Sequence, residues 1–202
     1  MTTYADLVTG VYNETKRPDL VTETANAIRR ATLKFHTADK WLRDLVSAVV
    51  PLTPLFTGDP RFQIDLTIAP FVRFRDINSV KQYVTPPNTW FIQFKRREVD
   101  DLLDAQYAIE DTNYYYRAGN TLNLRCTELI TNAQIWYYQF PNTSQDINYS
   151  SWIADVMPDA IIQEAAISLF TMIGKEASAR VYQNFFNENL SLLRQFGIVS
   201  GD

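Results

Sequence analysis

Residues that could support catalysis are few in this chain of 202 residues, and they are scattered along it. His36 is the single histidine. A nucleophilic serine or cysteine usually needs a histidine to accept its proton, and no serine here lies in a G-x-S-x-G motif. His36 falls at the expected end of a helix, where a partly exposed histidine near carbonyl groups is common. We therefore predict a structural role for it.

The single cysteine, Cys126, excludes an internal disulfide framework and a zinc site built on cysteines. It follows Arg125 in an expected strand, and a neighbouring guanidinium can activate a thiol. A cysteine that packs as a small apolar side chain is the commoner arrangement. The sequence therefore predicts a buried, structural cysteine.

The densest acidic group consists of Glu98, Asp100, Asp101 and Asp104. Carboxylate oxygens gathered in this way are what a two-metal nuclease requires. Three cations at residues 95–97 directly precede the group, which favours a solvated, charge-paired turn and no bound metal. The six glycines form no phosphate-binding loop motif, so no cofactor is predicted.

Two basic clusters could contact phosphate: Arg29, Arg30 and Lys34 form one, and residues 95–97 form the other. A solvated surface is the simpler interpretation, because the net charge of the chain is −4. Dedicated nucleic-acid binders are usually basic. The charge therefore argues against nucleic-acid binding by the whole surface.

Aromatic residues make up 13% of the chain, with dense runs at residues 114–116 and 136–138. Such rings can stack on sugars or bases, or form a subunit interface. Because side chains alternate along a strand, half of each run must face inward. The candidates for a contact surface are Trp90, Tyr115, Trp136 and Tyr137.

The elements that must position these residues begin with two helices. Apolar residues at helical spacing predict a first helix from about residue 4, capped by Thr2 or Thr3. A second helix follows, with Asp19 as its predicted N-cap, and ends near residues 36–39.

Strand patterns fill the middle of the chain, where apolar and polar residues alternate. The segments with this pattern are residues 62–68, 71–75, 90–94, 122–126 and 135–140. Turn residues at these intervals are typical of an antiparallel sheet or a small sandwich. A short helix or turn is expected at residues 98–103.

Helical spacing returns near residue 152, and Pro158 suits the first position of a helix. Gly174 interrupts the pattern, and a final helix is expected to stop at Gly197. The predicted fold class is α+β. N- and C-terminal helices, residues 1–40 and 151–202, form a helical bundle domain, and residues 41–150 form a central antiparallel β insert.

Targeting signals are not expected in this chain. No apolar run approaches the roughly 18 residues that span a membrane. The first residues lack the basic and apolar regions of a secretory signal. We expect synthesis and folding in a cytoplasm.

Residues 12–20 and 24–36 resemble the start of head-to-tail adaptor proteins of tailed bacteriophages. The later part of the chain is similar to the way these proteins enter their last two helices. The matching segments there are residues 137–141, 151–153, 157–162 and 165–166. The central strands carry little of the resemblance.

The resemblance implies a virion structural protein of the neck, made in the host cytoplasm and without catalytic residues. Adaptors form a homo-oligomeric ring, commonly a dodecamer, below the portal protein. The ring extends the DNA channel and docks the next neck or tail protein, and genomic DNA passes without specific binding. We expect the free protein to be monomeric and to assemble on the portal.

The resemblance also suggests contact residues. The C-terminal segment of adaptors often docks on the portal, and its residues here are Arg194, Phe196, Ile198 and Val199. The four candidate aromatic residues would face a neighbouring subunit or the tail. An acidic lumen would let DNA phosphates pass without adhering.

Three alternatives remain open. Within the same setting, the protein could be a tail-completion or tail-terminator protein. It could instead be a metal-dependent nuclease that uses Glu98, Asp100 and Asp101. The third alternative is a glycan- or receptor-binding module that uses Trp90, Trp136 and Tyr137.

Overall fold

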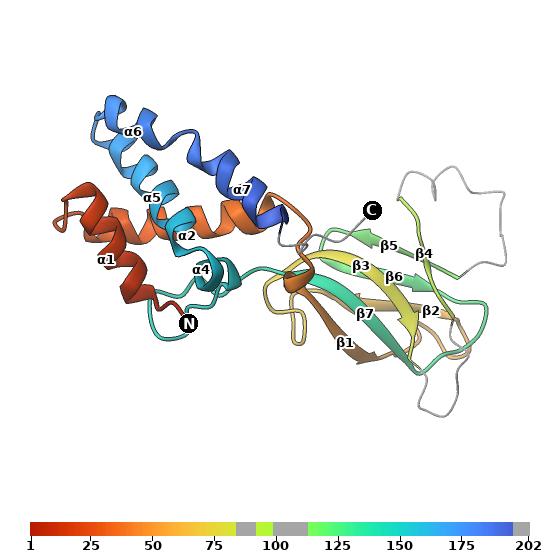
Figure 1. Ribbon diagram of the computed structural model, residues 1–202. Helices are drawn as coiled ribbons and strands as arrows, with labels where there is room; N and C mark the ends of the chain where they lie inside the picture. The colour runs from red at the N-terminus through yellow and green to blue at the C-terminus, as the bar shows by residue number, and fades with distance from the viewer. Residues whose placement is uncertain (84–91, 99–112, 196–202) are drawn as a thin grey trace. The chain divides into compact units, whose positions relative to one another are not determined.

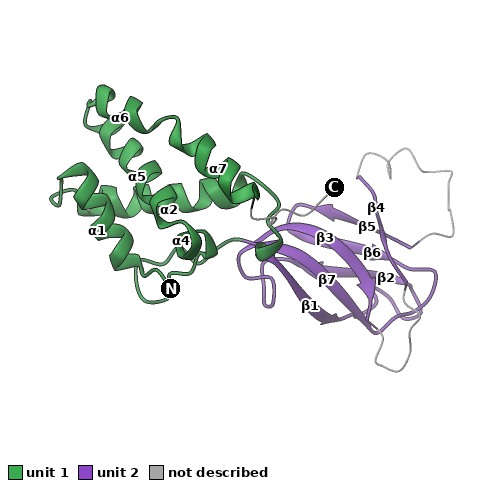
Figure 2. Ribbon diagram, viewed as in Figure 1, with its two compact units in different colours: residues 1–44, 140–202 green, residues 45–139 purple. Residues whose placement is uncertain are grey.

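The computed structural model describes residues 1–83, 92–98 and 113–195, and it shows a mixed α+β protein (Figure 1). The chain separates into two compact units, which Figure 2 shows in different colours. The helical unit comprises Met1–Asp44 and Phe140–Asp202, and the β unit comprises Leu45–Gln139. None of the helices within the described ranges combines the length and the apolarity needed to cross a membrane.

The second boundary between the units lies earlier in the chain than the sequence-based boundary at residue 150. Residues 140–150 belong to the helical unit, because Tyr149 is 6% exposed and packs in its core. Asn142 and Ser150 also exchange two backbone hydrogen bonds, at 3.1 and 2.9 Å, which close this segment into a loop.

The helical unit contains six α-helices and one short 3-10 helix within the described residues. They are α1 (Tyr4–Thr15), α2 (Val21–Thr37), η1 (Leu42–Asp44), α4 (Trp152–Val156), α5 (Pro158–Met172), α6 (Glu176–Tyr182) and α7 (Phe185–Gln195).

The helix caps follow the sequence prediction at α1 and depart from it at α2. Thr3 Oγ1 accepts a hydrogen bond from Asp6 N at 3.2 Å, and Asp6 accepts one from Thr3 N at 2.9 Å, which completes a capping box. The predicted Asp19 cap is wrong. Arg17 binds both carboxylate oxygens of Asp19 at 2.7 Å, and Leu20 occupies the N-cap position.

The chain after Pro158 forms one helix more than the sequence predicted. Pro158 begins α5, as predicted, and Gly174 follows its end with a φ of 73°, which glycine adopts without strain. The single final helix expected after Gly174 is instead two helices, α6 and α7.

The break between α6 and α7 lets two aromatic rings reach different partners. The Tyr182 ring in α6 stacks on Phe170 of α5 at 6.0 Å between centroids. The Phe186 ring in α7 packs against Phe35 of α2 at 4.8 Å. Each helix is therefore anchored at its own place on the unit.

The main hydrophobic core of the helical unit draws on both ends of the chain, and Ala166, Phe170 and Ala179 form a smaller separate cluster. The largest buried side chains of the main core are Leu7, Ile28, Phe35, Trp41, Ile153 and Ile161. Helix α5 contacts both α1 and α2. At one α1–α5 contact, a Cβ added to Gly10 would overlap the side chain of Ile162.

The β unit consists of two sheets around a second core. Its strands are β1 (Leu45–Pro51), β2 (Arg61–Asp65), β3 (Phe74–Gln82), β4 (Lys95–Arg96), β5 (Tyr114–Ala118), β6 (Thr121–Arg125) and β7 (Asn132–Gln139). One sheet has the order β1-β7-β3, and the other has the order β2-β6-β5-β4. The core takes Phe62, Leu122 and Leu124 from one sheet and Val80 and Ile135 from the other.

The strand register places apolar side chains opposite one another. Ile135 in the central strand β7 pairs with Ala48 of β1 on one side and with Val80 of β3 on the other. The β unit is therefore a small two-sheet sandwich whose inner faces share one core.

Several strand predictions need correction, and the strand expected at residues 62–68 ends at Asp65, where a turn follows. The pairing is not antiparallel throughout, because β4 and β5 are parallel. The chain between these strands exceeds the dozen or so residues that a parallel connection needs. The strand expected at residues 71–75 begins only at Phe74, because Arg73 has a φ of 62° and interrupts extended backbone. Trp90 and most of residues 98–103 lie outside the described residues.

Candidate functional site

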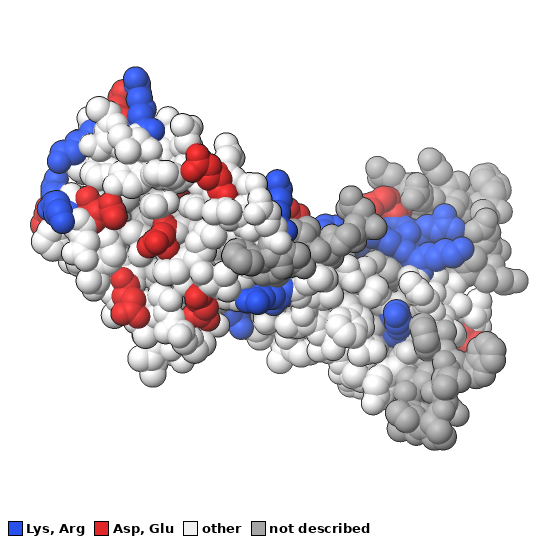
Figure 3. Space-filling view, in the orientation of Figure 1, with Lys and Arg blue, Asp and Glu red and all other residues white. Residues whose placement is uncertain are grey.

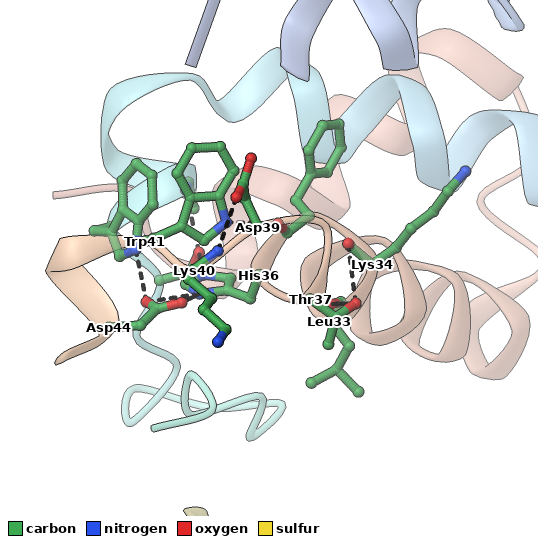
Figure 4. Close-up of polar contacts among 12 residues, drawn as sticks. Leu33, Lys34, His36, Thr37, Asp39, Lys40, Trp41 and Asp44 are labelled. Carbon is green, nitrogen blue, oxygen red and sulfur yellow. Dashed lines mark hydrogen bonds and ion pairs between the residues drawn. The ribbon is translucent and has the colours of Figure 1, made fainter. Parts of the chain in front are cut away.

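His36 lies in a buried polar network at the end of α2 (Figure 4). Its Nδ1 is 2.9 Å from each carboxylate oxygen of Asp44, and its Nε2 is 2.9 Å from Ser151 Oγ. The three side chains therefore have the connectivity of a Ser–His–Asp triad. Sequence reasoning missed this grouping, because 115 positions separate Ser151 from His36 and no motif marks either residue.

Further contacts hold the network together. Trp152 Nε1 donates a hydrogen bond to Asp44 Oδ1 at 2.8 Å. Ser151 is the N-cap of α4, where its Oγ accepts a hydrogen bond from Ala154 N at 3.3 Å. The network thus ties α2, η1 and α4 to one another.

Burial separates this network from a working catalytic triad. His36, Asp44 and Ser151 are 1%, 6% and 4% exposed, respectively. The Trp152 ring also packs edge-on against the imidazole, at 5.8 Å between centroids. A nucleophile must reach its substrate, whereas Ser151 Oγ is engaged by a histidine and by a helix N-terminus. The network is structural, and the partial exposure expected for His36 is wrong.

Cys126 is buried, as predicted, with 4% of its surface exposed. Burial raises the pKa of its thiol to about 12. The neighbouring Arg125 therefore does not produce a reactive thiolate.

Of the four residues in the acidic group, the structure describes only Glu98. Glu98 lies 3.3 Å from Arg96 Nε, so it takes part in the charge pairing expected there. Asp100, Asp101 and Asp104 lie outside the described residues. Across residues 1–83, 92–98 and 113–195, no three His, Cys, Asp or Glu side chains are grouped to hold a metal ion.

Two candidate aromatic residues belong to the core of the β unit. Tyr115 is 4% exposed and Tyr137 is 3% exposed. The Tyr137 hydroxyl donates a hydrogen bond to the carbonyl of Pro70 at 2.9 Å. Their rings therefore stabilise the sandwich and offer no open face to a neighbour, which corrects the sequence expectation. Trp136 is half-buried on β7, and Trp90 lies outside the described residues.

Of the four candidate docking residues at the C-terminus, the structure describes only Arg194. Arg194 Nε binds Asp39 Oδ2 at 2.8 Å, and its side chain is 53% exposed. This ion pair joins α7 to the residues that follow α2. Phe196, Ile198 and Val199 lie outside the described residues.

The first basic cluster is divided by the fold. Lys34 Nζ binds Glu164 at 2.6 Å and lies 3.9 Å from the centroid of the Phe186 ring. Arg29 and Arg30 are exposed on α2. Lys34 therefore makes contacts within the helical unit, although its side chain is still 48% exposed, and all three members of the cluster reach solvent.

One exposed apolar surface was not predicted from the sequence. Leu55 and Phe56 in the β1–β2 loop are 42% and 68% exposed, and Leu129 in the β6–β7 loop is 58% exposed. We call these three residues the apolar loop end. The sequence did contain a signal for this surface. The apolar pair Leu55 and Phe56 lies in a segment with Pro54 and Gly58, which is typical of a turn, and turns usually carry polar residues.

Backbone hydrogen bonds bring the two loops of the apolar loop end together. Leu52 N donates to Thr131 O at 2.8 Å, and Cys126 N donates to Pro60 O at 3.0 Å. The two loops therefore lie against each other at the same end of the sandwich.

A second exposed apolar surface lies beside the start of α1. It is a cavity of about 340 Å³, lined by residues 1–5, residues 145–147 and Tyr149. Ile147 at its rim is 99% exposed. We call it the α1 cavity.

The chain was also compared with known proteins. No protein-family model matches it, and no curated protein sequence matches it.

Proposed function

We propose that this protein is a virion structural protein, a head-to-tail adaptor that forms a ring below the portal of a tailed bacteriophage. In this role it extends the DNA channel and docks the next neck or tail protein. It is made in the host cytoplasm, becomes part of the neck of the virion, and carries out no catalysis.

The observation that carries the proposal is the way the chain is divided between its two units. Helices from both ends of the chain share one core, and the β sandwich is inserted between them. The sequence pattern predicted this arrangement, and the segments that resemble adaptors lie mainly in the helical unit: residues 12–20, 24–36, 137–141, 151–153, 157–162 and 165–166. In the proposal, the helices form the bundle and the sandwich is its insert.

The exposed apolar surfaces support assembly into a ring. A head-to-tail ring requires two different patches on each subunit. The apolar loop end and the α1 cavity are two such patches, one on each unit. Individual contacts can be weak, because a ring engages many of them at once.

Other contacts are assigned by the same proposal. Trp136 faces a neighbouring subunit or the tail. Arg194 belongs to the segment that docks on the portal, together with Phe196, Ile198 and Val199. Genomic DNA passes through the ring without specific binding.

Mixing the purified protein with the portal of the same phage tests the proposal. Size-exclusion chromatography with light scattering should show a monomer alone and a ring-sized addition to the portal in the mixture. A protein that ignores the portal and cleaves DNA in the presence of Mg²⁺ would instead support the nuclease alternative.

A further inference from the structure

A polar cavity of about 390 Å³ on the β unit brings three arginines together. Arg96 and Arg97 reach it from β4 and the residue after it, and Arg117 reaches it from β5. Figure 3 shows Lys and Arg side chains gathered over this part of the β unit. Two carboxylates, Asp76 and Glu98, also line the cavity, so the cations are in excess.

Arg117 is held in place by uncharged partners. Its Nε donates a hydrogen bond to the carbonyl of Gly119 at 2.7 Å, and its guanidinium lies 4.9 Å from the centroid of the Phe74 ring. These contacts orient the side chain without neutralising its charge. An anion that enters the cavity therefore meets a guanidinium whose conformational entropy is already reduced.

Arg96 is held more weakly. Its ion pair with Glu98 spans 3.3 Å, and the two side chains are 53% and 70% exposed. Exposed pairs of this kind contribute little to stability, so a doubly charged anion can compete with Glu98 for Arg96.

The neighbouring strand fixes the remaining wall of the cavity. Arg97 N donates a backbone hydrogen bond to Tyr115 O at 2.9 Å, which holds this arginine beside β5. The Tyr115 hydroxyl is protonated at neutral pH, as an ordinary tyrosine is, and burial raises its pKa further, so it can donate a hydrogen bond.

We propose that this cavity binds a phosphate group. A guanidinium presents paired N–H donors that match two phosphate oxygens, and phosphate has enough oxygens to engage several arginines at once. A single carboxylate has two oxygens and satisfies one such fork, so a peptide would have to place several carboxylates in the cavity where one phosphate suffices. The phosphate could belong to a DNA backbone or to a free anion. The proposal does not depend on the adaptor function.

Binding of three probes to the full chain tests the proposal. A fluorescently labelled DNA duplex is titrated with protein, and inorganic phosphate or a polyglutamate peptide is added as competitor at constant ionic strength. Arg117→Gln and Arg96→Gln should each weaken binding about tenfold, as expected for loss of a charge-assisted hydrogen bond. Arg125→Gln is the control, because it makes the same charge change in the same unit outside the cavity.

The outcomes distinguish a free phosphate from the phosphate of a DNA backbone. Displacement of the duplex by inorganic phosphate supports a site for a single phosphate, and retention of the duplex supports a site for the backbone. Binding of inorganic phosphate without the duplex, measured by isothermal titration calorimetry, supports a free anion. Absence of binding of both the duplex and inorganic phosphate, displacement by polyglutamate alone, or an equal loss in Arg125→Gln would overturn the proposal. Circular dichroism of each variant checks that the fold is intact.

Discussion

At the scale of single residues, the contacts of His36 determine what this histidine can do. Its two ring nitrogens are engaged by Asp44 and Ser151, and all three side chains are buried. Buried polar groups of folded proteins almost always have hydrogen-bond partners. A triad-like connectivity can therefore serve packing alone when no substrate can reach the serine.

Replacing His36 by alanine tests the structural role of the network. His36→Ala leaves the Asp44 carboxylate and the Ser151 hydroxyl buried without their imidazole partner. We expect the free energy of unfolding to fall by about 3 kcal/mol in urea denaturation. Glu176→Ala on the exposed face of α6 is the control and should change it by less than about 0.5 kcal/mol. Equal effects would contradict this account.

Cys126 gives a second prediction at the residue scale. Burial raises the pKa of its thiol from 9.0 to about 12, so the thiolate is rarer at pH 8 in the folded chain than in the unfolded chain. The ionised fraction falls about a thousandfold, as three pKa units require. Iodoacetamide labelling followed by mass spectrometry should therefore be slower in buffer than in urea by orders of magnitude. Rapid labelling of the folded protein would show that the thiol is activated.

At the scale of elements, the contact between α1 and α5 depends on the absence of a side chain at Gly10. A Cβ at this position would overlap Ile162 of α5. A larger residue here requires the Ile162 side chain to rotate away or the two helices to move apart, and either change disturbs this contact.

The substitution Gly10→Val tests the packing of α1 on α5. We expect it to lower the free energy of unfolding by about 1–3 kcal/mol, as overpacking does. Thr9→Val is the matched control, because residue 9 is exposed on the same helix and receives the same β-branched side chain. A Gly10→Val protein as stable as the control would show that α1 is free to shift.

At the scale of the whole molecule, the two units keep separate cores and present separate apolar surfaces. The apolar loop end belongs to the β unit, and the α1 cavity belongs to the helical unit. A subunit that offers different patches on different units can join its neighbours head to tail.

Phe56→Asp tests the apolar loop end as an assembly surface. Phe56 is 68% exposed, so a carboxylate there should leave the melting temperature nearly unchanged. In the proposed adaptor ring, a charge within an apolar contact should reduce assembly on the portal at least tenfold, by light scattering. Thr53→Asp in the same loop is the control. Equal assembly by both variants would exclude this surface from the ring.

The sequence by itself predicted the features that depend on a few neighbouring residues. Thr3 caps α1 and Pro158 begins α5, because caps and first-turn residues act within one turn of a helix. The burial of Cys126 was also predicted, because a cysteine most often packs as a small apolar side chain.

Only the tertiary structure decided which distant residues meet. It joined His36 to Asp44 and Ser151, and it buried the Tyr115 and Tyr137 rings that the sequence offered as surface aromatics. It also paired β4 with β5 in parallel, which brings Arg96 of β4 and the following Arg97 to one cavity with Arg117. These contacts depend on the path of the chain between the residues. The local pattern of apolar and polar residues does not determine that path.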